Sequence, residues 1–426
     1  MLCILNSKPK NKSDRSKHVS LLYKLFYFGL GIKRWLLLGL IGIMICSVGI
    51  AFIIKNVFDF VIPELLPWHW EGVIVGIVGL FAIAFAAIGL YRSLSPILFS
   101  SLGIDQVTNT VYVRRARSKG PKIVALGGGT GLSVVLKGLK IYSDNLSAIV
   151  SVGDDGGSSG ILREQLGLIP PGDFRNCLVA LAEDESLVGK LFQYRFSKGE
   201  GLQGHSFGNL FIAAMTNITG GFDQALIESS KVLSVTGNIL PSTLSPIELI
   251  VELVDGGIVR GESKIGETDG DIKRLSIEPA QVNAYPKSID ALYDAELIVL
   301  GPGSLYTSVL PSLLVPEINE AISKSSAYKI YVCNVAMQPG ETSGYGINEH
   351  VSALLNHTRD GFVDCIIGND LSSLAEESSV SNVPVGPTNV KGINIIYGDI
   401  MDVENKYRHE SNSLADLIIK VYDKSR

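Results

Sequence analysis

The sequence predicts an α/β protein with a Rossmann-like, doubly wound parallel sheet, preceded by a two-helix transmembrane hairpin. The sheet is predicted by short apolar runs rich in β-branched residues, which recur along residues 121–426. Some of these runs lead directly into glycine-rich loops followed by helical patterns, as in doubly wound folds. The hairpin is predicted by two long uncharged segments within residues 35–91.

Composition excludes several classes of protein. The 426-residue chain is 19% charged, and its mean hydropathy is +0.29, which excludes a disordered chain and favours a membrane-embedded part. The net charge is −5, but residues 1–120 hold 14 basic and 5 acidic residues, so the remainder is acidic and a poor partner for nucleic acid. The five cysteines show no CxxC spacing, which argues against a disulfide scaffold and a cysteine zinc site.

Two segments are candidates for membrane spans. Residues 35–54 and 72–90 contain no charged side chain, and as helices each is long enough to cross a hydrocarbon core of ~30 Å. Small-residue spacing such as Gly72–Gly76 and Gly76–Gly79 would let the two helices pack closely. The alternative is a pair of buried core helices, which rarely reach this length without a polar face.

The flanking charges predict an orientation in the membrane. Lys and Arg gather in residues 1–34 and again after the second span, whereas the intervening loop carries one lysine and three acidic residues. The positive-inside rule then places the N-terminus and the body in the cytoplasm of a multi-pass cell-membrane protein that contacts lipid. The predicted parts are a basic N-terminal segment 1–34, a hairpin 35–91, a basic linker 92–120 and a cytoplasmic α/β domain 121–426.

The body begins with a strand, a glycine loop and a helix. Residues 122–126 read as a buried strand, and helical spacing of leucine and valine follows from Leu132. Glycines let the main chain approach a phosphate, and a helix start supplies free N–H groups. The loop has neither the GxGxxG spacing nor the P-loop lysine, so a tight structural turn is the alternative. The candidate phosphate-binding residues are Gly128, Gly129, Thr130 and Gly131.

A second predicted strand, 148–152, leads into the acidic run GDDGGSSG at 153–160. The adjacent carboxylates of Asp154 and Asp155 could hold Mg²⁺ that bridges a diphosphate, or accept hydrogen bonds from sugar hydroxyls. An ordinary Asp-Gly turn is the alternative, although eight residues with four glycines exceed what a turn needs.

Two helix starts carry further polar candidates. Asp173 is predicted to cap a helix whose first turn holds Arg175 and Asn176. Farther along, His205 and Asn209 stand at the start of an apolar helix, where His205 is expected as a hydrogen-bonding wall rather than a catalytic base. For the first of these helices, a capped surface helix is an equally good interpretation.

A third predicted strand is also followed by a glycine-rich loop. Residues 295–300 form an apolar run that leads into GPGSLYTS at 301–308, and further strands are expected at 329–335 and 364–368. Two strand–glycine–helix junctions in one sheet point to a single crevice at the carboxyl ends of the strands. Glu341 lies in a loop expected near the same edge.

Six blocks of the body together resemble the gluconeogenesis factor family, which is similar to the 2-phospho-L-lactate transferases of coenzyme F420 synthesis. The blocks are GGGTGLSVVLKGLK, VGDDGGSSGILR, PPGDFRNCLVAL, GHSFGNLFIAAMTNITG, GPGSLYTSVLPSLLVP and CNVAMQPGETSGY, and the resemblance runs from Pro121 to the C-terminus. It implies a three-layer α/β fold with a helical insertion that binds a UDP-sugar such as UDP-N-acetylglucosamine. It also implies control of cell shape and cell-wall synthesis during gluconeogenic growth, with no reaction firmly attached. The two membrane spans depart from the commoner members of the family.

The resemblance also implies a set of site residues. In the transferases, acidic residues matching Asp154 and Asp155 sit where Mg²⁺ and the acceptor meet a GDP-type nucleotide. The late segment Arg408–Glu410 resembles the family's late Arg-His-acid segment, and the resemblance implies that Arg408 reaches the phosphates of the nucleotide sugar. The predicted nucleotide site therefore comprises Gly128, Gly129, Thr130, Gly131, Asp154, Asp155, Gly157, Asn176, His205, Asn209, Gly303, Ser304, Tyr306 and Arg408, with Asp154 and Asp155 as candidate Mg²⁺ ligands.

Three functions remain open from the sequence. The first is a membrane-tethered regulator that binds a nucleotide sugar, because no Ser–His–Asp order with a nucleophile motif and no His/Cys metal cluster is evident. The second is a Mg²⁺-dependent transferase that cleaves a nucleotide diphosphate. The third is a membrane scaffold with a vestigial pocket. The expected partners are a nucleotide sugar or dinucleotide with Mg²⁺, cell-wall synthesis or regulatory proteins, and a second copy of the chain in a homo-oligomer.

Overall fold

A computed structural model describes residues 32–58, 69–98, 115–183, 187–268, 270–359, 361–370 and 382–426. The chain divides into two units, Met1–Ala116 and Arg117–Arg426, and each is described by itself. Most of the predicted basic segment 1–34 and of the predicted linker 92–120 lies outside the described residues.

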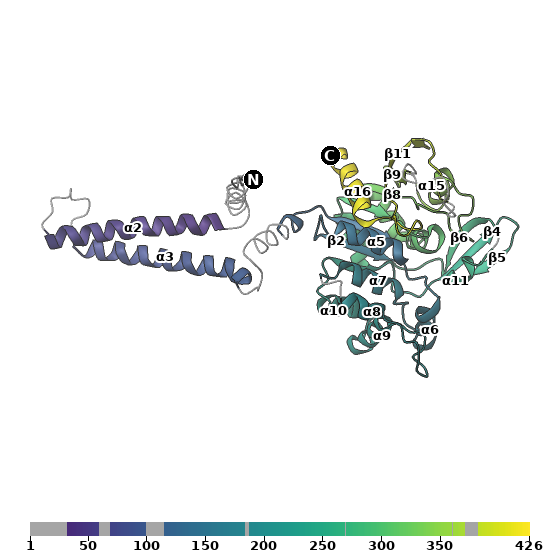
Figure 1. Ribbon diagram of the computed structural model, residues 1–426, viewed down its shortest axis with the longest axis horizontal. Helices are drawn as coiled ribbons and strands as arrows, with labels where there is room; N and C mark the ends of the chain where they lie inside the picture. The colour runs from purple at the N-terminus through teal and green to yellow at the C-terminus, as the bar shows by residue number, and fades with distance from the viewer. Residues whose placement is uncertain are drawn as a thin grey trace, which may run out of the picture. The chain divides into compact units, whose positions relative to one another are not determined.

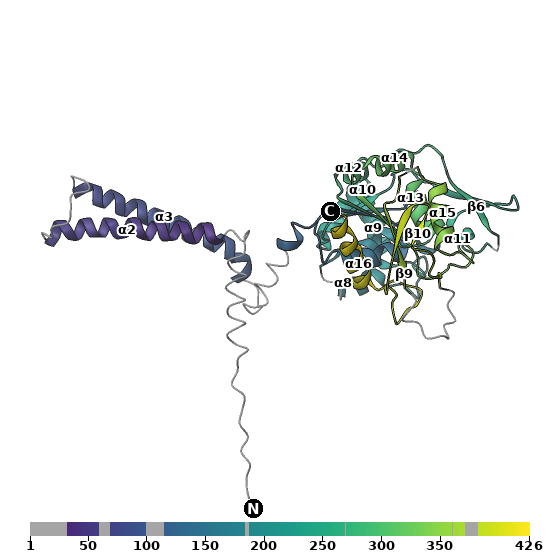
Figure 2. The same cartoon turned by 90° about the horizontal axis from the view of Figure 1, so that it is seen from above.

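The first unit contains two long helices, α2 (Ile32–Phe58) and α3 (His69–Leu98), which lie side by side (Figures 1 and 2). Their closest approach uses small residues: a Cβ added to Gly79 would lie 2.7 Å from the main-chain nitrogen of Cys46. Gly42 is similarly confined, because an added Cβ would lie 3.0 Å from the main-chain nitrogen of Ile83. Small side chains therefore allow the two backbones to meet at Gly42 and Gly79. Of the predicted spacing residues Gly76 and Gly79, only Gly79 lies at the contact, because a Cβ on Gly76 would meet nothing within 4 Å.

The prediction of a transmembrane hairpin needs correction. In the described residues, no helix combines the length and the apolar character that a membrane crossing requires. The spans predicted at 35–54 and 72–90, and the multi-pass cell-membrane placement with a cytoplasmic body, are therefore wrong on this finding. The prediction assigned the uncharged runs to lipid contact, whereas in the structure small residues within them, such as Gly42 and Gly79, serve the contact between the two helices.

The second unit is built on an eight-stranded sheet in the order β10-β11-β9-β8-β7-β1-β2-β3. Every neighbouring pair is parallel except β10 with β11, which confirms the predicted Rossmann-like sheet. The strands are β1 (Ile123–Gly127), β2 (Leu146–Val150), β3 (Asn238–Pro241), β7 (Leu297–Leu300), β8 (Tyr328–Val332), β9 (Cys365–Asn369), β10 (Asn389–Val390) and β11 (Ile393–Gly398).

The order of the strands creates a switch point between β1 and β7. From β1 the chain moves outward to β2 and β3, whereas from β7 it moves in the opposite direction to β8, β9 and β11. Both central strands are buried at every residue, as their continuous apolar sequences require of strands covered on two faces. Ligands of doubly wound folds bind outside the carboxyl ends of the strands at such a point.

Helices cover both faces of this sheet (Figure 2). On one side, α5 (Gly129–Leu139) packs against α7 (Gly172–Leu181) and α16 (Ser411–Ser425). On the other side, α12 (Pro286–Asp294) packs against α14 (Pro316–Lys324). This arrangement matches the three layers that the family resemblance implies. The remaining helices near the sheet are η1 (Leu305–Val309), α13 (Leu310–Leu313) and α15 (Ile347–Asn356).

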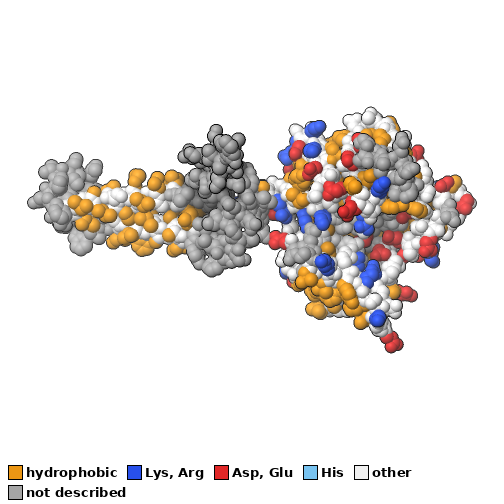
Figure 3. All heavy atoms as spheres, in the orientation of Figure 1, with side chains coloured by type: hydrophobic (Ala, Val, Ile, Leu, Met, Phe, Trp, Pro, Cys, Tyr) orange, Lys and Arg blue, Asp and Glu red, His pale blue; other side chains and the backbone are white. Residues whose placement is uncertain are grey.

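The implied helical insertion lies between β2 and β3. It comprises α7 together with α6 (Gly157–Leu166), α8 (Leu187–Gln193), α9 (Phe207–Thr219) and α10 (Phe222–Val232). An apolar patch covers α8 and α9 on the face shown in Figure 3, where Leu187, Leu191 and Ile218 are exposed.

A second, antiparallel sheet was not predicted from the sequence. It consists of β4 (Glu248–Leu253), β5 (Ile258–Arg260) and β6 (Ile272–Glu278), with β4 in the centre. Alternate residues of β4 are buried, which is the pattern of a sheet with one face on the core. The short helix α11 (Glu262–Ile265) follows β5 and brings Glu262 toward the carboxyl edge of the main sheet, close enough for the charges of Asp154 and Asp173 to act on it.

Candidate functional site

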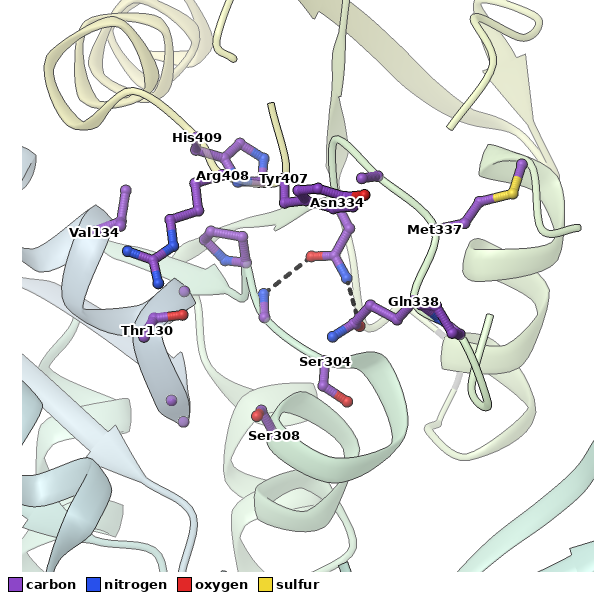
Figure 4. A pocket seen from close by; sticks show the side chains of 17 residues that line it. Thr130, Val134, Ser304, Ser308, Asn334, Met337, Gln338, Tyr407, Arg408 and His409 are labelled. Atoms are coloured by element: carbon purple, nitrogen blue, oxygen red, sulfur yellow. Dashed lines mark hydrogen bonds between the residues drawn. The ribbon is translucent and has the colours of Figure 1, made fainter. Parts of the chain in front are cut away.

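A cavity of about 300 Å³ opens at the switch point (Figure 4). Loops that follow β1, β7, β8 and β11 supply its walls, so residues far apart in sequence meet at one edge of the sheet. The lining residues are Gly128, Gly129, Thr130, Gly131, Val134, Pro302, Gly303, Ser304, Ser308, Asn334, Ala336, Met337, Gln338, Pro339, Tyr407, Arg408 and His409.

The loop between β1 and α5 forms one wall and is restricted to glycine at two positions. Gly129 has a φ of +60°, which a side chain with a branched Cβ adopts only under strain. A Cβ on Gly131 would lie 2.4 Å from the carbonyl oxygen of Pro302, so the two glycine junctions touch here. Gly128 at the N-cap position has no side chain to cap α5. Apart from the N–H of Gly129, which donates to Asp173, the positive end of this helix borders the cavity.

The loop after β7 forms the facing wall. The N–H of Gly303 donates to Oδ1 of Asn334 at 3.1 Å, which ties this loop to the end of β8. Ser304 caps η1 by accepting a hydrogen bond from the N–H of Thr307 at 3.1 Å. Its hydroxyl also donates to the carboxylate of Glu341, which fixes the following loop against the cavity.

The loop after β11 contributes a positively charged side chain to the cavity wall. Arg408 lines the cavity, beside His409 and Tyr407 (Figure 4). His409 is buried, and its Nε2 lies 3.1 Å from the carbonyl oxygen of Cys333, to which it must donate. Burial lowers the pKa of His409 to about 4, so this imidazole is neutral at pH 7 and Arg408 supplies the charge.

A second group of polar side chains lies where α6, α7 and α9 begin. The buried guanidinium of Arg175 donates to Oγ of Ser206 at 2.6 Å and to Oδ1 of Asn209 at 3.1 Å. Asn209 in turn donates to Oγ of Ser158 at 3.1 Å, and this hydroxyl lies 3.0 Å from Nδ1 of His205. The network holds the starts of the three helices together.

The carboxylates of the two predicted acidic residues, Asp154 and Asp155, have different hydrogen-bond partners in the structure. Oδ1 of Asp154 accepts from the N–H of Gly156 at 2.9 Å, and burial raises its pKa. Oδ1 of Asp155 instead accepts from the N–H of Ser263 at 2.8 Å and so caps the start of α11. Across the described part of the chain, no group of three or more His, Cys, Asp or Glu side chains is arranged to hold a metal ion.

Asp173 connects this polar group to the cavity, and its predicted role as a helix cap is wrong. Pro171 occupies the cap position, whereas Asp173 lies in the first turn of α7. Its carboxylate faces the glycine loop: it accepts a hydrogen bond from the N–H of Gly129, and a Cβ added to Gly128 would lie 2.5 Å from Oδ2. Burial and then the charge of Asp154 raise the pKa of Asp173 to about 6.

Two glutamates add to the same acidic surroundings. Burial raises the pKa of Glu262 well above its usual range, and the charges of Asp154, Asp173 and Glu341 raise it further. Burial also raises the pKa of Glu341, although hydrogen bonds from Ser304 and Thr307 oppose that shift. Glu341 was placed near this edge by its loop, but nothing in the sequence around Glu262 distinguishes it from a surface residue.

The predicted site residues therefore fall into three places. Those that line the cavity are Gly128, Gly129, Thr130, Gly131, Gly303, Ser304 and Arg408. Those in or beside the neighbouring polar group are Asp154, Asp155, Gly157, Asn176, His205 and Asn209. Tyr306 lies apart from both, because it is buried and its hydroxyl is 3.0 Å from that of Tyr345.

Sequence reasoning missed part of the cavity wall. Asn334 and Gln338 stand in one of the six family blocks, and Tyr407 and His409 flank the predicted Arg408. Asn334 lies at the carboxyl end of the strand predicted at 329–335, near the edge where ligands bind, and this position was a signal that could have identified it.

The fold and the cavity define a doubly wound α/β protein with a cavity at its switch point that Arg408 and the start of α5 border. The family model described as 2-phospho-L-lactate transferase CofD matches residues 123–401. A gluconeogenesis factor of Bacillus subtilis is 47% identical over 70% of this chain and 97% of its own length. A gluconeogenesis factor of Halalkalibacterium halodurans is 45% identical over 71% of this chain and 97% of its own length.

A solved structure agrees with these relatives. The crystal structure of a Bacillus halodurans protein is 44% identical, covers 71% of this chain and 99% of that chain, and superposes with a TM-score of 0.67. The chain belongs to the gluconeogenesis factor family, which shares the CofD domain.

Proposed function

We propose that the chain binds a nucleoside diphosphate sugar, with the diphosphate in the switch-point cavity. The observation that carries this proposal is the convergence of hydrogen-bond donors and one cation on a single space. The start of α5, the hydroxyl of Ser308 and the guanidinium of Arg408 all border it, and each favours an anionic oxygen. A volume of about 300 Å³ lies at the small end of ligand sites, which suits a diphosphate whose attached groups extend outward.

The neighbouring polar group supports a role in holding the sugar. Ser158, His205 and Asn209 are buried and hydrogen-bonded to one another, and their hydroxyl, imidazole and amide groups are of the kind that bind sugar hydroxyls. We therefore place the sugar toward α6 and α9, past Asp173. UDP-N-acetylglucosamine is the ligand we propose, and it makes the chain a ligand-sensing regulator of cell shape and cell-wall synthesis during gluconeogenic growth.

Calorimetry of the whole chain tests this proposal. UDP-N-acetylglucosamine and UDP are titrated with and without Mg²⁺, and uridine serves as the control that lacks phosphate. We expect both diphosphates to bind and uridine not to bind. Equal affinity for uridine, or no heat from any of the three at millimolar concentration, would remove the diphosphate from the cavity.

A second candidate function is a transferase like the one named in the matching family model. It is favoured by Asp173, whose carboxylate borders the glycine loop and has a pKa of about 6, within the range of a general base. Asp154 and Asp155 are the residues proposed to hold Mg²⁺ in this case, although the structure shows their carboxylates diverging. Release of UMP or UDP from a UDP-sugar in the presence of Mg²⁺ and an acceptor would establish this function, and binding without turnover would exclude it.

Self-association stays a proposal as well. Leu187 and Leu191 on α8 and Ile218 on α9 are exposed, and α8 packs against α9. Exposed apolar side chains on neighbouring helices favour a protein contact. Light scattering of Ile218→Glu beside the unchanged chain tests it, and an unchanged mass would remove the patch from any oligomer contact. Pull-down with cell-wall synthesis enzymes tests the proposed regulatory partners.

A further inference from the structure

Two amide side chains form part of the cavity wall. Asn334 follows β8, and Gln338 lies four residues later in the loop that leads to Glu341. Figure 4 shows both side chains converging on the space between Ser304 and Arg408. Asn334 binds the glycine junction that follows β7, and Gln338 is connected to this junction through Asn334.

The hydrogen bonds between these residues fix which end of each amide faces which neighbour. The N–H of Gly303 can only donate, so the group it meets at 3.1 Å must be the oxygen of Asn334. The nitrogen of Asn334 therefore points the other way and donates to Oε1 of Gln338 at 3.1 Å. That contact uses the oxygen of Gln338, which leaves its Nε2 directed into the cavity (Figure 4).

The main chain of Gln338 is held as well. Its N–H donates to the hydroxyl of Thr342 at 2.9 Å, and its carbonyl oxygen accepts from the N–H of Thr342 at 2.9 Å. Thr342 is fully buried, so the segment that carries Gln338 is anchored to the core. A side chain positioned in this way loses little conformational freedom when it binds a ligand.

We propose that Gln338 selects for a phosphoryl oxygen of the bound diphosphate by donating a hydrogen bond to it from Nε2. Asn334 is the positioning residue, because its hydrogen bond to Oε1 of Gln338 keeps Nε2 directed at the ligand. The inference rests on the diphosphate site proposed above and extends it to the choice between donor and acceptor on the ligand. Arg408 and Ser308 present donors to the same space, so a phosphoryl oxygen there is surrounded by groups that it can accept from. A ligand that presents a donor at this point would meet the amide nitrogen without a partner.

Three variants distinguish the effect of the hydrogen-bond donor on Gln338 from the effect of the size of its side chain. Gln338→Glu keeps an oxygen for Asn334 but replaces Nε2 by a second oxygen, so an acceptor faces the ligand. Gln338→Met keeps the length of the side chain and removes the donor without adding charge. Asn334→Asp still accepts from Gly303, but its second oxygen can only accept, so Gln338 must turn its nitrogen away from the cavity. Gln281→Glu, at an exposed position that does not line the cavity, is the matched charge control.

Calorimetry with UDP-N-acetylglucosamine and with inorganic pyrophosphate measures the effect, and thermal melting checks that each variant is folded. We expect Gln338→Glu and Asn334→Asp to weaken both ligands at least tenfold, Gln338→Met to weaken them about three- to tenfold, and Gln281→Glu to leave them unchanged. A loss confined to UDP-N-acetylglucosamine would place the contact on the base or the sugar and overturn the phosphoryl assignment.

The two proposals fail in different ways. If the unchanged chain binds both ligands and Gln338→Met binds them equally well, the role of Gln338 is refuted while the diphosphate site stands. If the unchanged chain binds neither ligand, the diphosphate site is refuted, and the role of Gln338 falls with it. Should Gln338→Glu fail to fold, the comparison of Gln338→Met with Asn334→Asp still decides the question.

Discussion

His409 should make the second unit less stable in acid, and replacing it by glutamine should remove that effect. The residue is 6% exposed and lies next to Arg408 in the cavity wall, with Nε2 donating to the carbonyl oxygen of Cys333. Burial is the main reason that its pKa falls to about 4 in the folded chain, against about 6.5 when it is unfolded. Glutamine places an Nε2 donor at a similar distance from the main chain and does not titrate.

The free energy of unfolding falls with decreasing pH because the unfolded chain takes up a proton at His409 before the folded chain does. As the pH falls below 6.5, the unfolded chain binds a proton at this residue and the folded chain does not, so stability is lost until the pH reaches about 4. Integrated from pH 7 to pH 5, that difference amounts to about 2 kcal/mol. Asp173 acts in the opposite direction, because its raised pKa of about 6 stabilises the folded chain by about 1 kcal/mol over the same change.

Urea denaturation of the unchanged chain and of His409→Gln at pH 7, 6 and 5 measures this term. Because both proteins keep Asp173 and the other histidines, the difference between their free energies of unfolding isolates His409. We expect the variant to gain about 2 kcal/mol relative to the unchanged chain between pH 7 and pH 5. Parallel pH profiles for the two proteins would show that His409 titrates normally and would refute the argument from burial.

Three further outcomes are expected at the cavity. Without Mg²⁺, UDP-N-acetylglucosamine should bind about tenfold more tightly at pH 6.0 than at pH 7.5, because protonation of Asp173 removes a negative charge beside the glycine loop; calorimetry should show no such slope for Asp173→Asn. Gly131→Ala should lower the free energy of unfolding by about 1–3 kcal/mol in urea, since its Cβ would lie 2.4 Å from the oxygen of Pro302. Arg408→Gln should weaken UDP-N-acetylglucosamine at least tenfold by calorimetry and leave the melting temperature unchanged, and a normal affinity would place the phosphates elsewhere.

The central strands could be predicted because their consecutive residues are all apolar, which is the pattern of a strand buried on both faces. β1 and β7 are apolar throughout, β1 ends at Gly127 and Gly301 follows β7, and parallel pairing follows from the helices between strands. The antiparallel sheet was missed because β5 has only three residues and a partly exposed pattern, which short-range reasoning does not distinguish from a loop. The hairpin was misjudged for a related reason, since the absence of charge alone does not identify what an apolar helix contacts.

The side chains of the site were predictable only where the main chain itself forms the contact. The glycine loops were found because close approach and positive φ demand glycine wherever the chain has that shape. Asp173 was misjudged because its partners, Gly128 and Gly129, are more than forty residues away in sequence, whereas a helix cap is a local pattern. Asn334 was missed for the same reason, since its orientation depends on Gly303 across the cavity.

The cavity wall favours a negatively charged ligand, whereas the neighbouring acidic residues disfavour one. The way in which this conflict of charge is resolved distinguishes the two candidate functions. The start of α5 and Arg408 favour an anion, whereas Asp173 and Asp154 beside them disfavour one. A diphosphate bound between them therefore needs either a proton on Asp173 or a cation to compensate the charge. If Mg²⁺ strengthens binding and abolishes its dependence on pH, the cation provides that compensation and the transferase gains support. If binding follows the titration of Asp173 and ignores Mg²⁺, the proton provides it, and the site is that of a ligand-binding regulator.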